Sequence, residues 1–95
     1  DDKEIRLREP VLQPDALMQM AELAQEGGNG LQARAFLERY AAVAPATAAT
    51  LWLGRNIELG LGDAAQAARY SQRLRNEFPT SEEASRLFEA ERAKP

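Results

Sequence analysis

The fold is decided by the stretch from Gly28 to Pro45, which reads GNGLQARAFLERYAAVAP. The stretch returns further along the chain, from Gly62 to Pro79, as GDAAQAARYSQRLRNEFP. Both copies begin with glycine and a helix-capping residue, share a Gln-Ala pair, carry an aromatic residue and end at proline. Upstream of these copies, Leu17 falls on Leu51 at the same offset. The residues that begin and end helices therefore recur together with the apolar positions, which predicts repeated units that stack on one another.

Helical signals precede and follow the glycines of the first unit. From Pro14 to Glu26 the apolar residues follow the spacing i, i+3, i+4, i+7, which predicts a helix that Gly27 and Gly28 end. Asn29 and Gln32 have the spacing of a capping box, so a second helix should begin at about Gly30. This helix must end before Pro45, because proline cannot continue the hydrogen-bond ladder.

The second unit repeats this order of signals. We expect a helix from about Thr47 to Leu59, a stop at Gly60 to Gly62, and a second capping box formed by Asp63 and Gln66. The helix that follows should run to about Glu77 and is closed by Pro79.

A last helix is predicted after Pro79, capped by Thr80 or Ser81. Leu87 and Phe88 form its narrow apolar stripe and its other positions are mostly polar. A repeat array ends with an element that is apolar on one side only, so this segment is expected to be a capping helix.

A helix-turn-helix unit of about 34 residues, the offset that carries Gly28 onto Gly62, is the signature of the tetratricopeptide repeat (TPR). The predicted fold class is all-α, a TPR-type right-handed superhelix of antiparallel helix pairs with about five helices. The expected division is the end of a preceding repeat or a tail at 1–13, unit 1 at 14–46, unit 2 at 47–79 and the capping helix at 80–95.

The first helix of unit 2 fits the repeat pattern poorly. When Pro79 is set at the closing position, Arg55 and Glu58 fall where small or aromatic residues belong. A shift of one residue places Leu53, Gly54 and Ile57 correctly. We therefore expect a one-residue slip between the two units in this helix.

Composition excludes several classes of function. The chain has 95 residues, a formal net charge of −3, and neither histidine nor cysteine. The charge does not provide the basic field that nucleic acid requires. Without histidine and cysteine the chain lacks the usual general base, the commonest metal ligand and the thiolate nucleophile. We expect no catalytic, cofactor-binding or metal-binding residues and therefore no enzyme.

The candidate binding surface is the concave groove that the first helix of each unit lines. Residues on these helices that face away from their partner helices are Met18, Glu22, Trp52 and Asn56. The carboxylate clamp of chaperone-binding repeats needs Lys and Asn at these positions, and only Asn56 matches. Glu22 would repel a carboxylate, so capture of chaperone tails is not expected. Trp52 is either an anchor for a partner or a core residue between neighbouring helices.

The order of segments resembles the C-terminal part of the type IV pilus biogenesis lipoproteins PilF and PilW, the pilotins of the pilus secretin. Five stretches carry the resemblance: LQPDALMQMAELA (12–24), ARAFLERY (33–40), LGRNIELGLGD (53–63), AARYSQRLRNEFP (67–79) and SRLFEAE (85–91). A generic repeat would not share the irregular second unit, with Leu-Gly-Arg in its first helix and Phe-Pro at its close.

This resemblance implies a scaffold at the periplasmic face of the outer membrane whose protein partner is a pilus secretin subunit. The family has no catalytic residues, and its lipid-accepting cysteine lies in an N-terminal region absent from this segment. We therefore expect no membrane contact by the segment itself, also because its longest uncharged stretch, Tyr40 to Gly54, is shorter than the ~20 residues of a membrane span. Two alternatives stay open, a generic TPR adaptor of another complex and an accessory domain of a longer protein. An apolar end exposed by truncation is also a surface for dimerisation.

Overall fold

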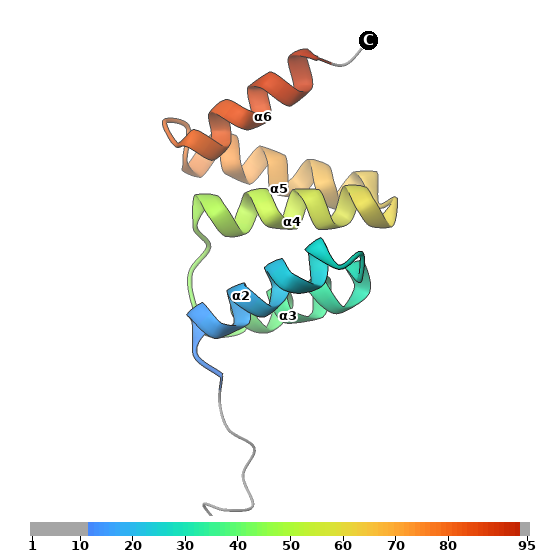
Figure 1. The fold of residues 1–95 in the computed structure, drawn as a ribbon. Helices are drawn as coiled ribbons and strands as arrows, with labels where there is room; N and C mark the ends of the chain where they lie inside the picture. The colour runs from blue at the N-terminus through green and yellow to red at the C-terminus, as the bar shows by residue number, and fades with distance from the viewer. Residues whose placement is uncertain (1–11, 94–95) are drawn as a thin grey trace, which may run out of the picture.

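The computed structural model describes residues 12–93, which form five α-helices without any strand in that range (Figure 1). Two antiparallel pairs stack in chain order, and the last helix packs on the second pair. The helices are α2 (Pro14–Glu26), α3 (Gly30–Val43), α4 (Ala48–Leu61), α5 (Ala64–Glu77) and α6 (Glu82–Arg92). The predicted all-α fold of about five helices is confirmed. The preceding repeat or tail expected at 1–13 falls almost wholly outside the described residues.

The turn within each pair depends on one glycine. Gly28 has φ of 78° and Gly62 has φ of 82°, both in the left-handed region. A Cβ at either position would meet nothing within 4 Å, so the backbone angle and not the available space favours glycine there. Gly27 keeps φ of −81°, so only the second glycine of the predicted Gly27–Gly28 stop is left-handed.

The predicted capping boxes are only half formed. The Asn29 side chain accepts a hydrogen bond from the Gln32 backbone N–H, and Asp63 accepts one from that of Gln66. The reciprocal bond to the cap backbone is missing, because the Asn29 N–H already donates to the Ala24 carbonyl at 2.8 Å. The Asp63 N–H likewise donates to a carbonyl of α4. In both turns, the backbone N–H that a capping box would need as a donor is already bonded to the end of the preceding helix.

A complete capping box begins α4 instead, at a place where the sequence analysis did not expect one. The Thr47 side chain accepts from the Thr50 N–H at 3.1 Å, and the Thr50 side chain accepts from the Thr47 N–H at 2.8 Å. The usual pattern has Glu or Gln at the third helical position, so a threonine pair is easily missed. α4 also extends to Leu61 and not to Leu59, because Gly60 remains helical and Gly62 is the residue that ends the helix.

The expected one-residue slip in unit 2 is wrong. The N-caps of α2 and α4 are Gln13 and Thr47, and the left-handed glycines that follow are Gly28 and Gly62. The step from one N-cap to the next equals the step from one glycine to the next, so the backbone register is the same at the start and at the end of the helix.

A close contact between Gly54 and Tyr70 accounts for part of the irregular pattern of unit 2. A Cβ built on Gly54 would lie 2.5 Å from the Tyr70 ring, so the ring occupies the space that a side chain at 54 would need. Tyr70 stands one position before Ser71, where the repeat usually has its aromatic residue. The Tyr70 ring of α5 therefore needs a residue without a side chain opposite it, and α4 carries glycine there.

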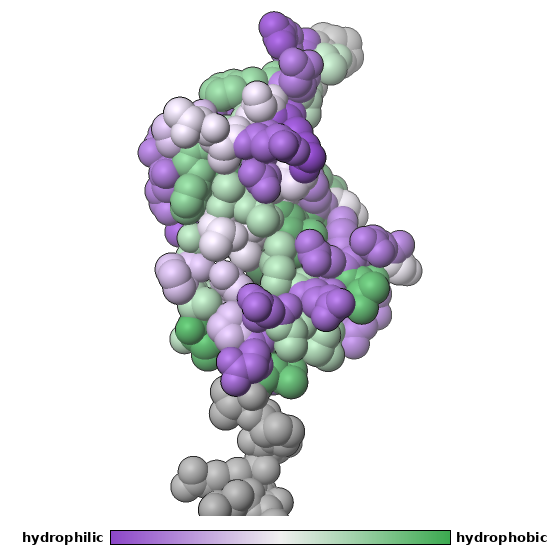
Figure 2. All heavy atoms as spheres, turned by 60° about the vertical axis from the view of Figure 1, so that its left-hand side comes forward, coloured by the Kyte–Doolittle hydropathy of each residue, from purple (hydrophilic) through white to green (hydrophobic). Residues whose placement is uncertain are grey.

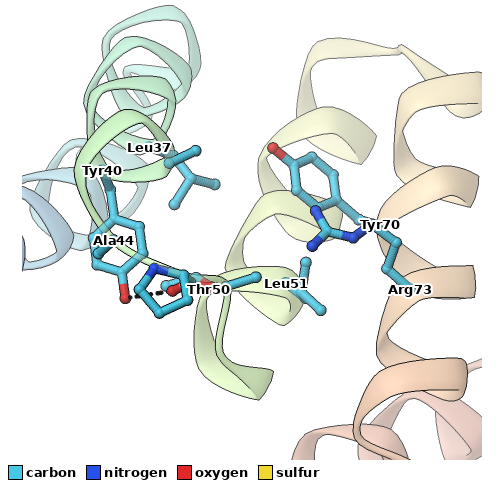
Figure 3. Close-up of a pocket in the computed structure, with 10 residues that line it drawn as sticks. Leu37, Tyr40, Ala44, Thr50, Leu51, Tyr70 and Arg73 are labelled. Atoms are coloured by element: carbon cyan, nitrogen blue, oxygen red, sulfur yellow. Dashed lines mark hydrogen bonds between the residues drawn. The ribbon is translucent and has the colours of Figure 1, made fainter.

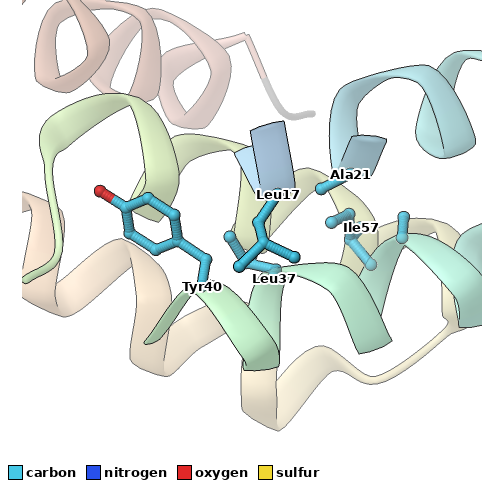
Figure 4. Packing of buried hydrophobic residues seen from close by; sticks show 6 residues of the cluster. Leu17, Ala21, Leu37, Tyr40 and Ile57 are labelled. Carbon is cyan, nitrogen blue, oxygen red and sulfur yellow. The ribbon is translucent and has the colours of Figure 1, made fainter. Parts of the chain in front are cut away.

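Two clusters of buried side chains hold the pairs together. The first lies between α2 and α3 and includes Ile57 of α4, as Figure 4 shows; its members are Leu17, Ala21, Ala33, Leu37, Tyr40 and Ile57. The second joins α4, α5 and α6, with members Leu51, Leu74, Ala84 and Leu87. α4 contributes to both clusters, so it links the two pairs into one stack.

An ion pair also joins the two pairs. Glu58 is 2% exposed and accepts hydrogen bonds from two nitrogens of the Arg34 guanidinium, one of them at 3.0 Å. Hydrogen bonding to Glu58 raises the pKa of Arg34, and the nearby Asp63 carboxylate contributes in the same direction. A buried carboxylate is tolerated when it is paired in this way, which explains an acidic residue at a core position.

The last helix covers the second pair with a stripe of two residues. Ser81 caps the helix, and Ala84 and Leu87 are fully buried. Phe88 is 49% exposed, so the predicted stripe of Leu87 and Phe88 is only half correct. Within residues 12–93 no helix has the length and apolar character that crossing a membrane requires.

Candidate protein-binding groove

A hollow of about 270 Å³ lies on the side of the stack that α2, α4 and α6 share. Each of the three helices contributes side chains to it: Glu22, Gln25 and Glu26 of α2, Ala49, Trp52, Leu53 and Asn56 of α4, and Glu83 and Arg86 of α6. In Figure 1, α2 and α4 lie in front of α3 and α5, and the turned view of Figure 2 shows hydrophilic groups separated by paler, weakly apolar surface. α4 supplies the apolar middle of the hollow, and the two outer helices supply charged margins.

Trp52 combines the two roles that the sequence left open. Its ring is half-buried and packs against the second core cluster, and it also lines the hollow. The Arg55 guanidinium lies 4.9 Å from the ring centroid, and its Nη1 donates to the Asn56 side-chain oxygen at 2.8 Å. Core packing and the cation–π contact therefore hold Trp52 in place while part of the ring stays accessible.

Of the four predicted groove residues, the structure brings three together. Glu22, Trp52 and Asn56 line the same hollow, whereas Met18 packs against the first core cluster and is absent from this lining. α2 is short, and Met18 lies one turn closer to its beginning than Glu22. That these side chains contact a partner stays a prediction.

A second hollow of about 230 Å³ lies between α3 and α5 (Figure 3). Leu37 and Tyr40 form one side, Tyr70 and Arg73 the other, and Leu51 lies between them. Two of its polar groups already have partners: Tyr40 donates to the Pro45 carbonyl at 3.1 Å, and Arg73 pairs with Glu77 at 3.0 Å. This hollow offers fewer unengaged polar groups to a ligand than the groove of α2, α4 and α6.

Tyr70, one of the two tyrosines that line the second hollow, is held in its neutral form. Burial raises the pKa of Tyr70, and the negative charges of Glu58 and Glu38 raise it further, while Arg73 and Arg34 oppose the shift. The phenol is therefore protonated at neutral pH and can donate a hydrogen bond.

Comparison with known families decides what this stack of helices is. The tetratricopeptide repeat pattern matches residues 15–47 and again residues 48–81. The chain belongs to the tetratricopeptide repeat family. No curated protein and no solved structure matches the chain.

TPR domains are generally non-enzymatic interaction modules, so membership indicates a scaffold that binds other proteins. The described residues contain no group of three or more acidic, histidine or cysteine side chains placed to hold a metal ion.

Sequence reasoning missed the groove residues that come from the end of α2 and from α6. Gln25 and Glu26 follow Glu22 by three and four positions, which places them on the same helix face. That spacing could have identified them. Glu83 and Arg86 carry no such signal, because the placement of α6 beside α4 depends on tertiary packing.

Proposed function

We propose that this TPR protein binds an extended or helical segment of a partner protein in the groove of α2, α4 and α6. The observation that carries the proposal is the half-buried Trp52 ring in the middle of a hollow that α2, α4 and α6 build. A large ring fixed by core packing provides contact area at a low entropic cost. Polar and charged side chains on both margins supply groups that can orient the bound segment.

We further propose that the chain is the C-terminal TPR segment of a type IV pilus pilotin. Its partner would then be a pilus secretin subunit, and its place the periplasmic face of the outer membrane. The resemblance of five stretches to the PilF and PilW lipoproteins supports this, in particular the irregular second unit. Gly54 and Tyr70 belong to two of those stretches, and their contact gives the glycine of the second unit a physical reason.

The test is co-purification of the tagged chain with a pilus secretin subunit. We expect the wild-type chain to retain the secretin and Trp52→Ala to retain several-fold less. Leu31→Ala is the matched control, since Leu31 is 66% exposed on α3 and lies outside the groove. Circular dichroism of each variant checks that the helices are intact.

The outcomes separate the two levels of the proposal. Retention that is lost equally in Trp52→Ala and Leu31→Ala contradicts the groove as the binding surface. Absence of retention by the wild-type chain, and by a longer version of it, contradicts the pilotin assignment and favours an adaptor of another complex.

A further inference from the structure

The charges along the groove are unbalanced. Glu22 and Glu26 on one margin and Glu83 on the other carry carboxylates for which the described residues provide no cation within 4 Å. The two nearby guanidinium groups are already engaged, Arg86 by Glu82 and Arg55 by the Trp52 ring and the Asn56 side chain. The groove therefore presents negative charge on both sides of an apolar middle.

Helix stability explains only part of this charge. Glu83 stands in the first turn of α6, where the helix dipole favours a carboxylate. Glu26 stands in the last turn of α2, where the dipole disfavours negative charge, and that turn has no basic residue. Glu22 stands one turn earlier on the same helix. The two carboxylates are four residues apart on one face, an arrangement in which like charges repel. α2 thus keeps two unfavourable carboxylates on the face that lines the groove.

We infer that the segment bound in this groove is basic, with an apolar side chain placed against Trp52 and Lys or Arg on either side of it. This inference rests on the proposed function, since it names the chemistry of the partner for the same groove. Charge complementarity carries it: a cation beside Glu22 and Glu26 relieves their repulsion, and one beside Glu83 meets a carboxylate on the opposite margin. The same carboxylates disfavour an acidic segment or a free C-terminal carboxylate, which would meet like charge on both margins.

The experiment uses the fluorescence of Trp52, which is the only tryptophan of the chain and so reports on the groove alone. Three peptides of equal length share one central leucine, lack aromatic residues and differ only in its neighbours: lysines, glutamines or glutamates. We expect a saturable change in fluorescence with the lysine peptide, and weaker binding of that peptide as salt is raised. The glutamine and glutamate peptides should bind at least about fivefold more weakly.

A pair of double variants with the same net charge locates the effect. Glu22→Gln with Glu26→Gln should weaken binding of the lysine peptide about five- to tenfold. Glu38→Gln with Glu89→Gln removes two carboxylates that do not line the groove, and it should leave the affinity within about twofold. Equal losses in both double variants would show a non-specific charge effect and would overturn the inference.

The remaining outcomes also overturn it. Equal binding of the lysine and glutamine peptides would leave a groove that binds segments without preference for basic ones, so the proposed function would stand and the inference would fail. Preferred binding of the glutamate peptide, or no binding of any peptide, would also refute it. The secretin co-purification tests the proposed function separately, because it depends on no particular peptide.

Discussion

At the scale of single residues, Gly54 and Tyr70 show how a repeat unit departs from its pattern without a change in backbone register. The ring of Tyr70 occupies the place of a Cβ at position 54, so the two residues form one packing unit across α4 and α5. Neither residue is informative when it is read alone. Together they explain why unit 2 carries glycine at position 54.

The first prediction concerns this packing unit. Gly54→Ala should destabilise the fold by about 1–3 kcal/mol, because the new methyl group meets the Tyr70 ring in a packed interior. Gly60→Ala is the matched control on the same helix, where the added Cβ has its nearest neighbour 3.8 Å away. Helix propensity should make that control more stable by about 0.5 kcal/mol.

Urea unfolding followed by circular dichroism measures both changes. If Gly54→Ala proves as stable as the wild type, the ring is free to move and the packing argument is wrong. Combining Gly54→Ala with Tyr70→Ala should give a smaller loss than the sum of the two single variants.

The second prediction is the pH dependence that Tyr70 contributes. Its folded-state pKa is raised above the ordinary value of 10.0, so the folded state binds the phenolic proton more tightly than the unfolded chain does. This contribution is fully present below the unfolded pKa. It is lost as the pH rises from that value through the folded pKa.

Unfolding in urea between about pH 9 and pH 11 should therefore show stability falling more steeply for the wild type than for Tyr70→Phe. Tyr40→Phe leaves Tyr70 as the only tyrosine, so tyrosinate absorbance in that variant reads the raised pKa directly. A titration midpoint at or below the ordinary tyrosine value would contradict the expected direction.

At the scale of helices, local signals set most of the bounds. The left-handed glycines, the Asn29 and Asp63 caps and the prolines each act within about one helical turn, and the four helices of the two pairs begin within one residue of their expected positions. The end of α4 lies two residues beyond the expected position. Gly60 remains helical because Gly62 provides the left-handed residue that ends the helix. The Thr47 and Thr50 box was missed because Thr50 stands at the third helical position, where the usual pattern has Glu or Gln.

The third prediction tests that box. Thr47→Ala removes a side-chain acceptor and should cost about 1 kcal/mol of stability. Thr80→Ala is the control, because Thr80 is exposed and Ser81 is the cap of α6. In thermal unfolding followed by circular dichroism, only Thr47→Ala should have a lowered midpoint. Equal midpoints for the two variants would exclude a capping role.

At the scale of the whole molecule, stacking decides which apolar residues are buried. Ile57 is 1% exposed inside the cluster of the first pair, whereas Leu23, which holds the same repeat position one unit earlier, is 61% exposed. No described helix covers Leu23, while the first pair covers Ile57. The Arg34 and Glu58 ion pair belongs to the same contact, so the boundary between the pairs combines an apolar contact with a charged one.

The fourth prediction concerns the coupling of the two pairs. Ile57→Ala should lower stability by about 2–5 kcal/mol, because it leaves a cavity where α4 enters the first cluster. Leu59→Ala, two residues along the same helix and 46% exposed, should change stability by only about 0.5 kcal/mol.

Because repeat stacks unfold as nearest-neighbour systems, Ile57→Ala should also lower the dependence of unfolding on urea concentration. A loss of stability without this change would mean that the pairs remain coupled through the other contacts.

The sequence by itself determined the number of helices, their approximate bounds, the turns and the repeat period, since these depend on residues within one turn of each other. It also indicated that Glu22, Trp52 and Asn56 lie on the groove side of their helices, because helical spacing determines which residues share a face. Only the tertiary structure decided that Met18 joins the core, that Glu58 is buried against Arg34, that Tyr70 excludes a side chain at Gly54, and that α6 forms a margin of the groove. Each of these outcomes depends on contacts between residues far apart in the chain, and such contacts are set by how one helix pair stacks on the next.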